Sequence, residues 1–158
     1  MNFRRRAWLI ASVLSLVVGG AGAAPSEEGD EQALTADADY AAGLAALKSD
    51  DYSGALPHFL GALKRFPEAA NLYNELGYTF RKLGRLDKAF EHYKRALAID
   101  PRHRGAHEYI GEAYLMAGDV ASAQKHLEAL RLICTLPCDE MRELQAALDA
   151  HRSRTSAR

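Results

Sequence analysis

The chain has 158 residues, of which 48% are hydrophobic and 26% are charged. This length fits one domain, and the composition excludes a wholly disordered chain. The formal net charge is −1, and no run of lysine and arginine is long enough to follow a phosphate backbone. We therefore expect no nucleic-acid partner.

The N-terminus has the pattern of a secretory signal peptide over residues 1–23. Three arginines precede an apolar run at 7–18, and small residues follow it, with cleavage expected after Ala23. The alternative is an uncleaved membrane anchor, but the run is shorter than the roughly 20 residues that span a bilayer. Removing the three arginines changes the net charge from −1 to −4. We expect an exported protein, periplasmic or secreted, with no stable membrane span after cleavage.

Residues 24–35 follow as an acidic segment that contains few apolar side chains. Such a segment buries too little surface to offset the entropy lost on ordering. The sequence therefore predicts a flexible lead-in to the folded domain.

The rest of the chain repeats itself every 34 residues. Gly77 has counterparts at Gly43 and Gly111, and Ala89 has counterparts at Ala55 and Ala123. Apolar residues three and four apart lie on both sides of a polar break at 83–85, which indicates two packed helices in each copy. The predicted repeats are 36–69, 70–103 and 104–137, each a helix-turn-helix.

The central copy resembles a tetratricopeptide repeat (TPR). The matching positions are Tyr73, Leu76, Gly77, Phe80, Ala89, Tyr93, Ala96 and Pro101. The resemblance implies an all-α fold, an α-solenoid of three TPR helix-turn-helix repeats.

Residues 138–152 are predicted to form a C-terminal capping helix. Met141, Leu144 and Leu148 share one face, while the other positions are largely charged. The basic tail at 153–158 is expected to be frayed.

Cys134 and Cys138 are the only cysteines, and they lie between the last repeat and the capping helix. In an exported chain the two thiols are expected to form a disulfide, provided that the intervening residues turn. A redox-active pair and a metal site with His126 or His151 are the alternatives. The spacing differs from that of thioredoxin, and a metal would need more ligands.

No motif of a catalytic site is present, so we expect no enzyme, no cofactor and no metal. His107 takes an aromatic position of the third repeat and is expected to pack, while the other histidines are expected to face solvent. Glu108 and Glu112 lie four apart on one helix face, and we interpret them as part of a solvated face.

In the TPR family the first helix of each repeat lines a concave groove that binds peptides. Counted from each glycine, the resemblance implies a lining of Tyr40, Leu44, Leu47, Lys48, Asn71, Asn74, Tyr78, Arg81, Lys82, Glu108, Glu112, Leu115 and Met116. Some family members hold a C-terminal carboxylate with lysine, asparagine and arginine. Those positions carry Tyr40, Leu44, Glu75, Gly105 and Tyr109 here, so that clamp is absent.

The resemblance thus implies a non-catalytic protein-protein interaction module, an adaptor or assembly factor that binds a peptide segment in its groove. The alternatives are a self-assembling structural module, which would be a homo-oligomer, and a thiol redox or metal-handling factor that uses Cys134 and Cys138. The sequence does not name the partner.

Overall fold

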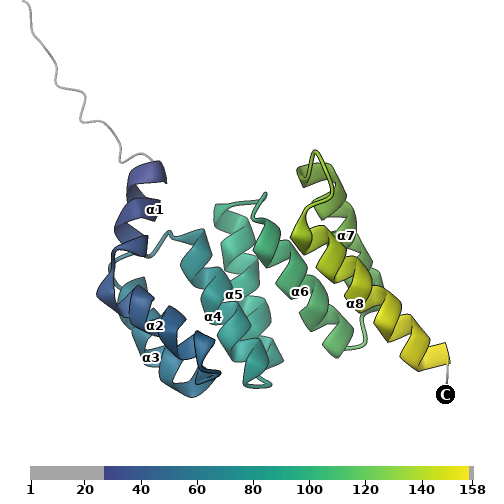
Figure 1. Ribbon diagram of the computed structural model, residues 1–158, viewed down its shortest axis with the longest axis horizontal. Helices are drawn as coiled ribbons and strands as arrows, with labels where there is room; N and C mark the ends of the chain where they lie inside the picture. The colour runs from purple at the N-terminus through teal and green to yellow at the C-terminus, as the bar shows by residue number, and fades with distance from the viewer. Residues whose placement is uncertain (1–26, 157–158) are drawn as a thin grey trace, which may run out of the picture.

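The computed structural model describes residues 27–156, and the predicted signal peptide lies outside them. These residues form eight helices and no strand: α1 (Glu27–Thr35), α2 (Ala38–Lys48), α3 (Tyr52–Leu63), α4 (Ala70–Lys82), α5 (Leu86–Ile99), α6 (Arg104–Met116), α7 (Val120–Ile133) and α8 (Asp139–Ser156). The helices stack in chain order from one end of the molecule to the other, and α8 crosses in front of α6 and α7 (Figure 1). The predicted all-α solenoid of helix pairs with a C-terminal cap is confirmed.

The turn inside each pair needs one residue with positive φ. Asp50, Gly84 and Gly118 take this conformation at φ 57°, 74° and 80°, and they are spaced 34 residues apart. Glycine adopts it without strain because it has no Cβ, whereas Asp50 is one of the few other residue types that tolerate it. The positive φ angle of the turn therefore recurs with the same 34-residue period as the sequence.

Close approach of the two helices in the first and second pairs depends on a glycine. A Cβ on Gly77 would lie 2.5 Å from the Tyr93 ring, and one on Gly43 would lie 2.4 Å from Phe59. Both aromatic rings are buried, so each fills the space that the missing side chain leaves.

In the third copy, the glycine packs against a helix from outside the pair. Gly111 is contacted by Leu144 of α8, which a Cβ would approach to 2.7 Å. Leu144 and Leu148 join Leu127 and Leu130 of α7 in a core shared by the last three helices. The capping helix is therefore an integral part of the third repeat's core.

Both ends of the chain are more helical than the sequence predicts. Residues 27–35 of the expected flexible lead-in form α1, and α8 continues through 153–156 of the expected frayed tail. Leu34 explains the first difference, because its side chain is fully buried in the main core. The burial of this leucine favours the docking of a segment that composition alone describes as flexible.

Gly77→Ala should lower the free energy of unfolding by about 1–3 kcal/mol, because the new methyl group overlaps a buried ring. Chemical denaturation followed by circular dichroism measures the change. Gly105→Ala is the matched control in a helix, since its Cβ would meet Asn74 at an ordinary 3.5 Å. An equal loss in both variants would show that the helix packing at Gly77 is not the cause.

Candidate functional site

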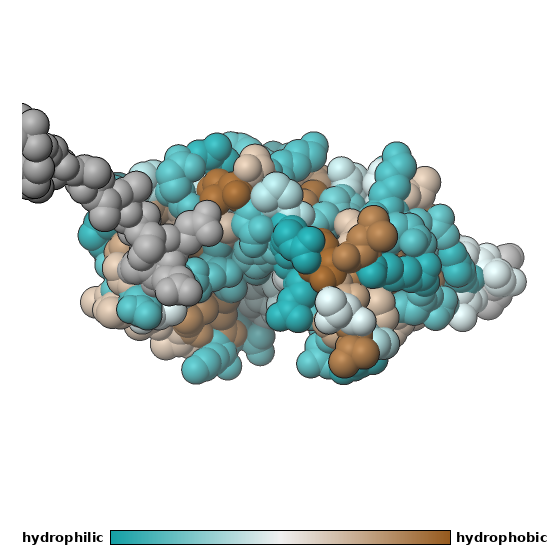
Figure 2. Space-filling model, turned by 90° about the horizontal axis from the view of Figure 1, so that it is seen from above, coloured by the Kyte–Doolittle hydropathy of each residue, from teal (hydrophilic) through white to brown (hydrophobic). Residues whose placement is uncertain are grey.

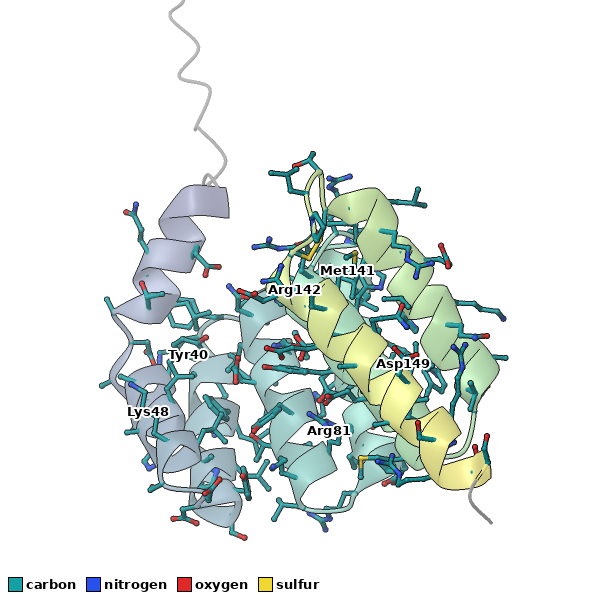
Figure 3. The ribbon with its side chains drawn as sticks, turned by 45° about the vertical axis from the view of Figure 1, so that its right-hand side comes forward. Tyr40, Lys48, Arg81, Met141, Arg142 and Asp149 are labelled. Carbon is teal, nitrogen blue, oxygen red and sulfur yellow. A yellow bond between two sulfur atoms is a disulfide. The ribbon has the colours of Figure 1, made fainter. Side chains whose placement is uncertain are left out.

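The inner side of the stack is formed by the first helices of the pairs. Figure 2, which looks at the stack from above the view of Figure 1, shows an indentation between the N-terminal helices on its left and the C-terminal helices on its right. Figure 3 places Arg81 of α4 between these two groups of helices. Helices α4 and α6 pack against each other, and α8 packs on α6, so side chains from three helices can meet here.

Three tyrosines, the tyrosine row, cross this side from one repeat to the next. Tyr52 begins α3, Tyr78 lies on α4 and Tyr109 lies on α6. The ring centroids are 6.3 Å apart for Tyr52 and Tyr78, and 5.2 Å apart for Tyr78 and Tyr109. These half-buried rings offer a rigid contact surface with hydroxyl groups at its edge.

Two cationic side chains lie against the tyrosine row, and they differ in solvent exposure and in ion pairing. The Arg81 guanidinium lies over the rings of Tyr78 and Tyr109, at 5.3 and 5.4 Å from their centroids. Its side chain is only 11% exposed, and it makes an ion pair of 2.7 Å with Glu112. Arg81 also donates a hydrogen bond to the Tyr93 hydroxyl at 3.3 Å. It therefore holds α4, α5 and α6 together.

Lys82 is the free cation of this surface. It is exposed, and its ammonium group lies 5.2 Å from the centroid of the Tyr52 ring and 5.8 Å from that of Tyr78. No carboxylate among the described residues lies within 4 Å of it. A partner carboxylate can therefore approach Lys82 without displacing an existing ion pair.

The C-terminal side of the same surface is acidic. Glu108 is only 4% exposed, which corrects the expectation that it lies on a solvated face. Burial raises the pKa of Glu108 to about 9, and a hydrogen bond to Glu143 of α8 and the charges of Glu112 and Glu140 act in the same direction. Glu108 therefore keeps its proton to a higher pH than an exposed glutamate does.

The thirteen predicted groove residues divide into three groups in the structure. Tyr78, Arg81, Lys82 and Glu112 meet around the tyrosine row. Tyr40, Asn74, Glu108 and Leu115 are buried and cannot form an open surface. Tyr40 packs on Phe59 with ring centroids 6.0 Å apart.

The remaining five lie around these groups. Leu44 and Leu47 are half-buried against the main core, while Lys48 and Met116 are exposed. Asn71 accepts a hydrogen bond from His103 at 2.7 Å and donates one to Glu31 of α1. Asn71 therefore fastens α1 to the first helices of the second and third repeats.

Two members of the tyrosine row were missed as lining residues by sequence reasoning. Tyr52 begins the second helix of its repeat, which the groove pattern does not include. Tyr109 has Ala41 and Glu75 at the equivalent positions of the other repeats, so no periodic signal marks it. Only the spatial order of α3, α4 and α6 brings these rings together.

Two histidines, His103 and His126, are more buried than the sequence predicts. His107 packs as expected, but its Nδ1 lies 2.9 Å from Nδ1 of His126, whose ring is half-buried and stacks on Tyr114. Burial lowers the pKa of His126 to about 4. His103 accepts a hydrogen bond from the Ala106 amide at 3.1 Å as the N-cap of α6. His103 serves as a cap and His126 packs on Tyr114, which corrects the expectation that these two side chains face solvent.

The sulfur atoms of Cys134 and Cys138 lie 2.14 Å apart, within disulfide distance, with 6.0 Å between the Cα atoms. The segment between α7 and α8 therefore makes the turn that a bridge requires.

Within residues 27–156 no group of three or more histidine, cysteine, aspartate or glutamate residues could hold a metal ion. None of the described helices combines the length and the apolar character needed to cross a membrane.

Two family models of the tetratricopeptide repeat match this chain, one over residues 40–103 and the other over residues 80–148. Together they extend over more than half of the sequence. The chain belongs to the tetratricopeptide repeat family. These repeats are non-catalytic scaffolds for protein binding, and the chain is not an enzyme.

Solved structures of the same fold include bacterial and fungal proteins. The translocator chaperone SycD of type III secretion from Yersinia enterocolitica is 19% identical with a TM-score of 0.65, over 83% of this chain and 88% of that chain. The Sgt2 TPR domain from Aspergillus fumigatus is 20% identical with a TM-score of 0.64, over 84% and 82%. SycD in complex with a peptide of the translocator YopD is 21% identical with a TM-score of 0.62, over 82% and 97%. Such identities show the fold alone.

A curated relative is much longer than this chain. The CTR9 homolog from Arabidopsis thaliana is 29% identical over 97 residues, which are 61% of this chain but 8% of that protein. The likeness therefore concerns one short array of repeats within a large protein.

Glu108→Gln should remove a loss of stability that the wild-type protein shows between pH 7 and 9. A carboxyl whose pKa is raised stabilises the fold most below its unfolded pKa, and this contribution is lost as the pH rises through the folded value of about 9. Glu75, whose pKa is raised to about 7 by burial, acts in the same direction at lower pH. Denaturation curves at several pH values should show a slope of at most about 1.4 kcal/mol per pH unit, and Glu108→Gln should flatten it.

Glu128→Gln is the control for this measurement, because Glu128 is exposed on α7 and lies 2.6 Å from Arg131. It should keep the wild-type slope. A slope between pH 7 and 9 that persists in Glu108→Gln would contradict the raised pKa of Glu108.

Proposed function

We propose that this protein is an adaptor or assembly factor that holds a peptide segment of a partner protein against the tyrosine row. The observation that carries the proposal is the alignment of Tyr52, Tyr78 and Tyr109 across three helices, with exposed Lys82 beside them. Tyrosine rings provide a large contact area with little side-chain entropy to lose, and such residues dominate binding energy at interfaces.

The rigidity of this surface supports the proposal. The ion pair between Arg81 and Glu112 fixes α4 against α6, so the ring positions are set before a partner arrives. Preorganised side chains reduce the entropy that binding costs. SycD, which has the same fold, is described in complex with a peptide of the translocator YopD. By analogy, we propose that this chain binds a peptide on its inner side.

The location of the protein is a second part of the proposal. The N-terminal pattern at 1–23 favours export to the periplasm or beyond, where a disulfide between Cys134 and Cys138 is stable. The partner would then be another exported or envelope protein.

The binding surface can be tested by affinity capture from the periplasm of the source organism. Tyr78→Ala and Lys82→Glu are introduced separately, and Lys94→Glu is the matched control. Lys94 is also an exposed lysine over an aromatic ring, 6.0 Å from the centroid of Phe90 on α5. Arg81 is left intact because it joins three helices. We expect a protein that the wild type and Lys94→Glu retain, and that each of the other variants retains at least about tenfold less.

Thermal melting of the four proteins, which should agree within a few degrees, excludes misfolding as the cause. Retention of the same proteins by all four baits would contradict binding at the tyrosine row.

The proposed export predicts that the mature chain begins at Ala24. Intact-mass measurement of the protein from the periplasmic fraction of a Gram-negative host should show loss of residues 1–23. Leu14→Arg interrupts the apolar run and should leave the full-length chain in the cytoplasm. A wild-type chain that keeps Met1 in the periplasm would contradict cleavage, and one that stays in the cytoplasm would contradict export.

A further inference from the structure

Glu75 lies on the inner side of the stack, at the edge of the tyrosine row. It precedes Tyr78 by three residues on α4, so the two side chains share one face of that helix. Burial raises the pKa of Tyr40 on α2 and of Tyr109 on α6, and the charge of Glu75 adds to both shifts. The Glu75 carboxylate therefore acts on both neighbouring first helices and belongs to the proposed peptide-binding surface.

The Glu75 carboxylate has no cationic partner in the described part of the chain. No lysine, arginine or histidine nitrogen of residues 27–156 lies within 4 Å of it. Arg81 on the same helix is paired with Glu112 instead, at 2.7 Å. Burial raises the pKa of Glu75 to about 7, yet the residue stays partly exposed to solvent. A cation that approaches from solvent can therefore pair with a carboxylate that burial has deprived of water.

Asn74 adds a second acceptor without a donor beside this carboxylate. The residue is only 5% exposed, and its side chain hydrogen-bonds to Glu75. A Cβ on Gly105 would lie 3.5 Å from Nδ2 of Asn74, so the amide fills the contact between α4 and α6. Its Oδ1 atom is buried and has no hydrogen-bond partner among the described residues. A buried acceptor without a donor is costly, so both residues favour a ligand that carries several N–H groups.

The chemistry around Glu75 favours an organic cation over a metal ion. No group of three or more histidine, cysteine, aspartate or glutamate residues in the described helices could hold a metal. The neighbouring rings of Tyr78 and Tyr109 already carry one guanidinium group, that of Arg81, at 5.3 and 5.4 Å from their centroids. A guanidinium group donates to a carboxylate as a planar fork and stacks on aromatic rings, whereas an ammonium group acts as a point charge. An arginine side chain of the partner therefore fits this surface best, and a lysine provides the same charge.

We propose that Glu75 determines the specificity of the tyrosine row by binding an arginine or lysine side chain of the partner segment, with Asn74 as the adjacent acceptor. This inference rests on the proposed function and names the side chain that a bound segment has to carry. Exposed Lys82 lies about two helix turns further along α4 and can take an acidic side chain of the same segment. Opposite charges at the two positions then fix the direction in which the segment binds.

A displayed library of random short peptides tests the proposal without knowledge of the natural partner. The protein is expressed as the full chain, and its processed form is identified by mass spectrometry. The library is selected in parallel on the wild type, on Glu75→Gln and on the control Glu128→Gln, which removes an exposed acid of α7. We expect the peptides that the wild type and the control select to share an arginine or lysine at one position. The peptides selected by Glu75→Gln should lack this preference.

Binding of one synthetic peptide then measures the contact itself. The peptide that binds the wild type most tightly is compared with a version that has glutamine in place of its cation, by titration calorimetry. Glu75→Gln and the glutamine peptide should each raise the dissociation constant at least about tenfold. The two changes together should cost little more than either alone, because both remove the same contact. Arginine and lysine versions of the peptide show which of the two cations binds more tightly.

Misfolding is excluded by thermal melting at pH 8. Glu75→Gln should melt at or above the wild-type temperature, because a neutral amide avoids the cost of a charge held away from water. Equal affinity of the wild type and Glu75→Gln for the peptide, or selected peptides that share no cation, would overturn the role of Glu75 while the tyrosine row remains a peptide-binding surface. Peptides that Tyr78→Ala binds as tightly as the wild type would instead contradict the proposed function. A wild type that selects no peptide would overturn both.

Discussion

The packing of a bulky side chain onto a glycine is the contact on which this structure depends. Tyr93 fills the space over Gly77, Phe59 fills the space over Gly43, and Leu144 fills the space over Gly111. The absent Cβ sets how closely the two helices approach, and the buried side chain supplies the apolar surface that holds them. The glycines recur every 34 residues; the first two join the helices of one pair, and the third joins α6 to α8.

The third of these contacts explains why the last helix is part of the fold. Leu144 comes from α8, so the third pair completes its core with a side chain from beyond the repeat. Burial raises the pKa of Glu108 to about 9, and Glu143 and Glu140 of α8 act in the same direction. The raised pKa of Glu108 therefore depends in part on the helix that ends the array.

The same stacking builds the proposed binding surface. Tyr78 and Tyr109 belong to neighbouring first helices, and Tyr52 extends their row from the start of α3. Arg81 is held by Glu112 and Tyr93, whereas Lys82, the next residue, stays exposed. Adjacent cations on one helix thus have different roles, because a helix turns by about 100° between successive residues.

The sequence by itself determined the helix pairs, their period and their family, because the 34-residue spacing of small and large apolar residues is a local property of the chain. It also placed Tyr78, Arg81, Lys82 and Glu112 on one surface, since these positions follow from the repeat. Only the tertiary structure decided that Tyr40, Asn74, Glu108 and Leu115 are buried and that Tyr52 and Tyr109 complete the row. It also decided that Leu34 orders α1. The physical reason is that burial and pairing depend on which helix lies opposite a side chain, and periodicity along one helix carries no information about its neighbour.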